Sequence, residues 1–120
     1  EKVNELLLEA LETELGGVQI YETAIRCAMN EDLREEWEEY LEQTRTHVTT
    51  LQNVCKELGI DAEQETPGRK VVRHIGSSLV QAMSMAQQNG NREEGLIKIL
   101  DISWGRYDCG TMFQLLLICA

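Results

Sequence analysis

Three side chains of metal-binding types fall on the apolar stripes of predicted helices. Glu14 occupies the stripe position between Leu11 and Val18, His47 interrupts a second stripe, and Asp108 lies on a third. Carboxylates and imidazoles on the inward faces of helices are how bundle proteins carry ligands to a metal ion in their core. Carboxylate oxygen and imidazole nitrogen suit Fe and Mn, so all three residues are candidate ligands.

Four amphipathic helices would have to position these side chains. Apolar residues recur with helical periodicity over four stretches, 3–29, 31–58, 67–88 and 92–119. Gly59 is a typical helix C-cap, and Thr66 followed by Pro67 is a typical helix start. No stretch alternates like a β-strand. The expected fold class is therefore all-α, a four-helix bundle that forms one domain over residues 1–120.

The connection between the second and third helices is longer than a simple turn. Eight to ten extended residues reach about 26–35 Å, which is close to the length of the shorter third helix. Such a link allows the chain to run back along the bundle before the third helix begins. We therefore predict that the second and third helices are parallel and joined by a crossover.

The polar positions on the stripes repeat between the two helical hairpins. Thr44 and His47 follow Glu14 by 30 and 33 residues, and Asp108 follows Ile75 by 33. Di-metal carboxylate bundles use a comparable plan, with one Glu on each of two helices and a Glu-x-x-His pair on each of the others.

With this pattern the chain resembles the ferritin-like superfamily, in particular its stress-associated YciE/YciF-like branch. The stretch Tyr40–Leu51, YLEQTRTHVTTL, is similar to the second-helix motif of that family, and Tyr107–Asp108 is similar to its fourth-helix motif. The resemblance implies a ferritin-type crossover, a homodimer, a two-metal centre that holds iron, and a role in the stress response.

The chain also departs from the family pattern. Thr44 stands in place of the carboxylate on the second helix, Gly105 in place of that on the fourth, and Ile75 or Gly76 in place of that on the third. The matching metal ligands that remain are Glu14, His47 and Asp108. Replacements off the pattern are Glu42, His74 and Asp101. Three ligands can hold one ion but poorly hold two, so we expect a degenerate, mononuclear site for Fe or Mn.

Each candidate ligand also has an ordinary structural explanation. His47 could be a hydrogen-bonded core histidine, Glu14 could pair with Arg45 or Arg106, and Asp108 could bond a tyrosine. The alternative function is then a metal-free structural or interaction bundle that dimerises through the third-helix stripe or the terminal LLLICA. A di-iron oxidase or peroxidase is a third interpretation, and it needs more carboxylates than remain.

Composition excludes several classes of partner. The 21 acidic and 11 basic residues give a net charge of −10, which provides no basic face for nucleic acid or for an anionic membrane. The N-terminal residues do not resemble a signal peptide, and LLLICA is too short to span a bilayer. The four cysteines lack CxxC spacing, so we expect reduced thiols in a cytoplasmic protein.

Overall fold

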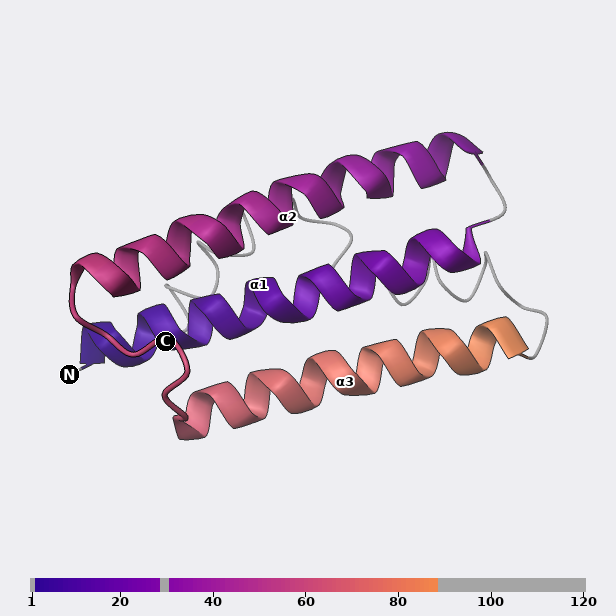
Figure 1. Cartoon of the computed structure of the whole chain (residues 1–120). Helices are drawn as coiled ribbons and strands as arrows, with labels where there is room; N and C mark the ends of the chain where they lie inside the picture. The colour runs from indigo at the N-terminus through magenta and orange to yellow at the C-terminus, as the bar shows by residue number, and fades with distance from the viewer. Residues whose placement is uncertain (1, 29–30, 89–120) are drawn as a thin grey trace.

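The structure, a computed structural model, describes residues 2–28 and 31–88, which form three α-helices and no strand. They are α1 (Lys2–Cys27), α2 (Glu31–Glu57) and α3 (Pro67–Gln88) (Figure 1). All three agree with the helices predicted at 3–29, 31–58 and 67–88, and the all-α class is confirmed for this part of the chain. The fourth predicted helix, 92–119, lies outside the described residues together with Asp108.

The signals for helix ends act as the sequence predicts. Gly59 follows α2 with a φ of 71°, in the left-handed region that favours glycine. The Ile60 amide then donates to the Cys55 carbonyl at 2.8 Å and satisfies the end of the helix. At the start of α3, the Thr66 hydroxyl accepts a hydrogen bond from the Arg69 amide at 3.1 Å, which is a helix N-cap.

In the described part of the chain, α1 lies between the other two helices. It packs against both α2 and α3, which do not contact each other (Figure 1). Arg69 of α3 contacts Glu12 of α1, and farther along both helices Gly76 of α3 contacts Gly16 of α1. Both contacts advance in the same direction, so α3 runs parallel to α1. Since α2 runs antiparallel to α1, it is also antiparallel to α3. The prediction that the second and third helices are parallel is therefore wrong.

The physical reason lies in the connection 58–66, which is folded rather than extended. The Gln64 amide donates to the Asp61 carbonyl, and the Glu63 amide donates to the Asp61 side chain, both at 3.0 Å. These turns shorten the reach of the connection. It passes across the end of the bundle near the start of α1 and does not run along its length (Figure 1).

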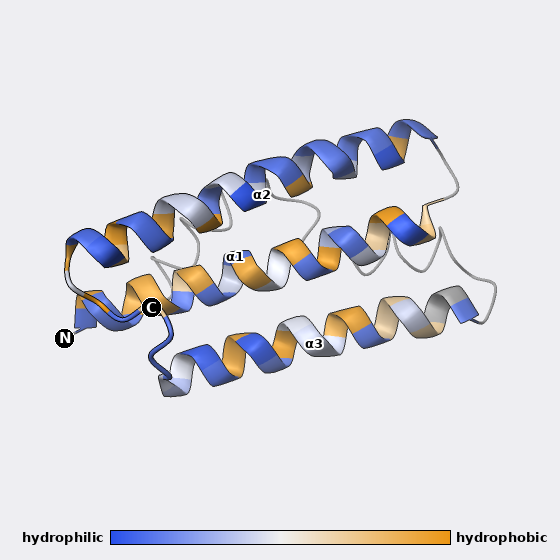
Figure 2. Cartoon of the chain, viewed as in Figure 1, coloured by the Kyte–Doolittle hydropathy of each residue, from blue (hydrophilic) through white to orange (hydrophobic). Residues whose placement is uncertain are grey.

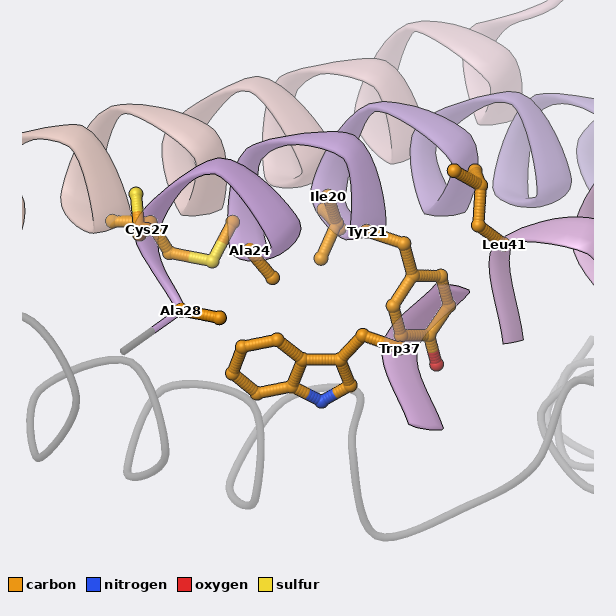
Figure 3. Close-up of a cluster of buried hydrophobic side chains, with 8 residues drawn as sticks. Ile20, Tyr21, Ala24, Cys27, Ala28, Trp37 and Leu41 are labelled. Carbon is orange, nitrogen blue, oxygen red and sulfur yellow. The ribbon is translucent and has the colours of Figure 1, made fainter. Parts of the chain in front are cut away.

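The core consists of two groups of buried apolar side chains. In the larger one, Ile20, Tyr21 and Ala24 of α1 lie around Trp37 of α2 (Figure 3). Met83 of α3 belongs to the same group. The smaller one lies nearer the start of α1 and contains Ala10, Leu11 and Leu51. Fully burying such an aliphatic or aromatic side chain contributes about 1.5–3 kcal/mol, so these groups hold α2 and α3 on α1.

Outside this core, α2 is largely hydrophilic (Figure 2). The acidic residues between Glu31 and Glu42 of α2 are all exposed to solvent. Cys27 and Cys55 are both buried, as predicted for core cysteines. No helix among the described residues is long and apolar enough to cross a membrane.

Candidate functional site

Two of the three predicted metal ligands come together between α1 and α2. Glu14 is buried, with 4% of its surface exposed, and its Oε2 lies 3.6 Å from Nδ1 of half-buried His47. The antiparallel packing of the two helices sets this register. Two turns away, the rings of Tyr21 and Tyr40 are opposed in the same way, with centroids 5.8 Å apart. The structure therefore brings together two of the three residues predicted as ligands, and Asp108 lies outside the described residues.

The carboxylate of Glu14 lies in an environment that disfavours its charge. Burial raises the pKa of Glu14 to about 7, because the charged form loses hydration. No Arg or Lys of the described residues forms an ion pair with it. Arg45, which the sequence offers as a partner, instead pairs with Glu22 at 3.4 Å. An additional cation beside Glu14 would therefore replace hydration that the carboxylate has lost.

Thr44 lies one turn from His47 and is almost completely buried, at 1% exposure. Its hydroxyl donates to the Tyr40 carbonyl at 2.7 Å, within the same helix. The two polar residues that interrupt the apolar stripe of α2 therefore differ in depth. Thr44 is buried in the core, and His47 lies at its edge. Thr44 places no negative charge beside Glu14.

The spacing of the Glu14 and His47 donors fits one shared metal ion. Ligand atoms about 2.1 Å from the same ion can lie up to about 4.2 Å apart, and the observed separation is 3.6 Å. However, residues 2–28 and 31–88 contain no group of three or more His, Cys, Asp or Glu side chains that could hold a metal. A complete site would need a further ligand from outside this part of the chain.

The remaining candidate ligands do not complete the site. Glu42 and His74 are exposed, and Asp101 and Asp108 lie outside the described residues. Gly76, the expected carboxylate position of the third helix, packs on Gly16 between α1 and α3. A side chain at position 76 would therefore meet α1 on the side that carries α3, whereas Glu14 pairs with α2.

A second polar cluster, which the sequence analysis missed, joins α1, α3 and the connection between α2 and α3. Nε of buried Arg69 donates to Oε1 of buried Glu12 at 3.0 Å. Nη1 of Arg69 donates to the carbonyls of Ala62 and Gln64 at 2.6 and 3.0 Å. One guanidinium therefore fixes the connection against α1.

Arg73 extends this cluster to the surface. It donates to Glu12 at 2.9 Å and to Glu65 at 2.6 Å. The hydrogen bond from Arg73 lowers the pKa of Glu65, and the bonds to Glu65 and Glu12 raise the pKa of Arg73. The two acidic side chains are thus matched by guanidinium groups, which suits a structural role better than metal binding.

A sequence signal for this cluster exists. The segment of α3 contains basic residues in its first two turns and no acidic residue, while Glu9 and Glu12 lie near the start of α1. The Glu9 side chain reaches the start of α3, where it occupies the space that a Cβ on Gly68 would need. The helix dipole also stabilises a carboxylate at the N-terminus of α3. The signal becomes specific only once α3 is known to be parallel to α1.

The described residues thus supply a carboxylate–imidazole pair as the candidate functional site and a separate guanidinium–carboxylate cluster as a structural one. The pair can bind a cation or exchange a proton, and the cluster is saturated by its own charges. Comparison of the chain with protein-family models, with characterised proteins and with solved structures finds no match.

Proposed function

We propose that this chain is a ferritin-like four-helix bundle that binds one Fe or Mn ion through Glu14, His47 and Asp108. The observation that supports the proposal is the buried Glu14 carboxylate, 3.6 Å from an imidazole nitrogen and without an Arg or Lys ion-pair partner among the described residues. A divalent cation carries two positive charges and would compensate this carboxylate better than an imidazole does.

The ligand types favour one ion over two. Glu14 supplies one negative charge and His47 supplies a neutral nitrogen, while Thr44 supplies no charge. A second ion would lack the carboxylates that offset its charge, so a di-iron oxidase or peroxidase is the less supported function. The bound ion would act as a Lewis acid or a one-electron centre. A role in stress-related metal handling in the cytoplasm follows from the family resemblance alone.

The proposed site also requires the fourth helix, 92–119, to complete the bundle. Support comes from the arrangement of the described helices, because α2 and α3 both pack on α1 without contacting each other. In a four-helix bundle, the fourth helix packs between two such helices. The apolar stripe of 92–119 would cover α2 and α3, and Asp108 would face Glu14 and His47. The antiparallel arrangement of α2 and α3 differs from a ferritin-type crossover. The proposal therefore rests on the Glu14–His47 pair and not on the helix topology.

Metal analysis of the full chain tests this function. Protein purified without chelator is loaded anaerobically with Fe²⁺ or Mn²⁺, desalted and measured by elemental analysis. We expect at most about one ion per chain, because the ligands offset the charge of a single divalent ion. Glu14→Gln and His47→Gln should each lose the ion. The matched controls Glu22→Gln and His74→Gln should retain it. Absence of metal from the wild type, or full retention by Glu14→Gln, would refute the proposal.

A second candidate function is a metal-free interaction bundle that dimerises through α3. Val71, Ile75 and Met85 of α3 are 60%, 49% and 61% exposed, and helical spacing places them on one face. Symmetric dimers commonly cover such a face. Light scattering at tens of micromolar should then report a dimer that Val71→Ser with Ile75→Ser dissociates. A monomeric wild type would exclude this function.

A further inference from the structure

A groove of about 450 Å³ runs along the contact between α1 and α3. Neither Glu14 nor His47 lines it, so it is separate from the candidate metal site. Gly16 and Gly76 line it, together with Leu15 and Val18. Its volume falls within the range of small-molecule sites, about 300–1,000 Å³.

The two glycines contribute differently to the groove. A Cβ on Gly76 would lie 3.7 Å from the Gly16 Cα, so Gly76 allows the two helices to approach. A Cβ on Gly16 would meet no atom within 4 Å. The space above Gly16 is therefore open because this residue lacks a side chain, and a larger residue there would fill the groove.

Three hydrogen-bonding side chains line the groove without strong partners. Among the described residues, the side chains of Gln19 and Ser77 form no hydrogen bond, and Glu22 has only the long 3.4 Å contact with Arg45. Their acceptor atoms are an amide oxygen, a hydroxyl oxygen and a carboxylate oxygen. A primary ammonium group has three N–H donors and matches such a set.

The charges around the groove also favour a cation. Arg73 also lines the groove, but Glu12 and Glu65 already bind its guanidinium, so it offers little to an anion. The net charge of −10 adds a general attraction for cations. We propose that this groove binds a small primary alkylamine, with the ammonium group at Glu22, Gln19 and Ser77 and the aliphatic stem on Gly16, Leu15 and Val18.

Titration of the full chain with pentylammonium chloride, followed by amide NMR shifts, tests this site. The amides of Gly16, Gly76 and Ser77 should shift in a saturable way. Pentan-1-ol, which has the same stem without the charge, should bind about tenfold more weakly because it lacks charge-assisted hydrogen bonds. Equal binding of the alcohol would refute the ammonium site.

Two pairs of variants separate the groove from general attraction to an acidic protein. Glu22→Gln should weaken binding about tenfold, whereas Glu38→Gln, which makes the same change in net charge on the exposed face of α2, should not. Gly16→Leu should abolish saturable binding by filling the groove, whereas Gln43→Leu on α2 should preserve it. If Gly16→Leu does not fold by circular dichroism, Ser77→Leu tests the same space from α3.

Arg45→Gln adds a variant with the opposite expected sign, because it removes the guanidinium that contacts Glu22 at 3.4 Å and should tighten binding. Equal weakening by Glu22→Gln and Glu38→Gln would show that pentylammonium responds only to net charge. Saturable binding that survives both groove-filling variants would place the amine elsewhere. Either result would overturn the proposed site.

Discussion

Nε of Arg69 donates to Oε1 of Glu12 at 3.0 Å, and both side chains are buried. The same guanidinium donates to two carbonyls of the connection between α2 and α3. Arg69 thus joins three separate parts of the chain at the end of the bundle. Burial of a charged pair has a desolvation cost that the pairing offsets, so removal of one partner leaves the other charge buried without compensation.

Arg69→Met is therefore expected to lower the free energy of unfolding by about 3 kcal/mol, because Ala62 and Gln64 lose their donor and Glu12 keeps only Arg73. Urea denaturation measures this loss. Arg73→Met should cost much less, because the Arg73 guanidinium is half-exposed and its ion pair with Glu65 is open to solvent. A larger loss for Arg73→Met than for Arg69→Met would contradict the central position of Arg69.

The metal-free protein is expected to lose stability as pH rises through neutrality. The pKa of Glu14 is raised from 4.5 to about 7, so the folded state binds this proton more tightly than the unfolded state does. The stabilisation is fully present below the unfolded pKa and is lost as pH rises to the folded pKa. The loss is roughly 2 kcal/mol between about pH 5 and pH 8.

Urea denaturation at both pH values, in the presence of a chelator, measures this loss in the wild type and in Glu14→Gln. The variant cannot ionise at position 14, so its stability should depend less on pH. Other titrating groups are common to the two proteins and cancel in the comparison. Identical pH dependence of the two proteins would show that Glu14 is not responsible.

Thr44→Glu tests whether a carboxylate at this buried position of α2 can bind a metal ion. A carboxylate at this buried position should destabilise the metal-free protein by several kcal/mol, since burial removes the hydration of its charged form. Fe²⁺ or Mn²⁺ should restore much of the lost thermal stability. Thr49→Glu, at an exposed position of α2, is the matched control. A loss that neither metal repairs would favour the metal-free bundle.

Two glycines should respond to alanine with opposite signs. Gly16→Ala should stabilise the protein by up to about 1 kcal/mol, because alanine has the higher helix propensity and its Cβ would meet no atom within 4 Å. Gly59→Ala should destabilise it by about 1 kcal/mol, because φ at this position is 71°. Thermal denaturation compares both with the wild type, and a shared sign would contradict the assigned backbone roles.

Helix positions were predictable because their signals are local. Periodicity placed all three described helices, and Gly59 and Thr66 marked where α2 ends and α3 begins. The direction of α3 was not predictable, because it depends on how the connection folds. The turn at Asp61 and the carbonyls bound by Arg69 shorten a segment whose length alone suggested a crossover.

The candidate site was predictable to the same extent. The stripe position of Glu14 indicated burial, and the short hairpin indicated that it would meet His47. Periodicity specifies a face but not a depth, so it did not predict that His47 is only half-buried. The contact between Glu12 and Arg69 joins residues 57 positions apart. It requires the parallel packing of α1 and α3, which no local signal supplies.

The central place of α1 has a thermodynamic consequence. In the described part of the chain, α2 and α3 share no direct helix–helix contact, whereas each packs along α1. Changes at distant sites usually add in free energy. The costs of Leu51→Ala on α2 and Met83→Ala on α3 should therefore sum, whereas Met83→Ala and a change at Ile20 of α1, in one apolar group, should show a coupling energy.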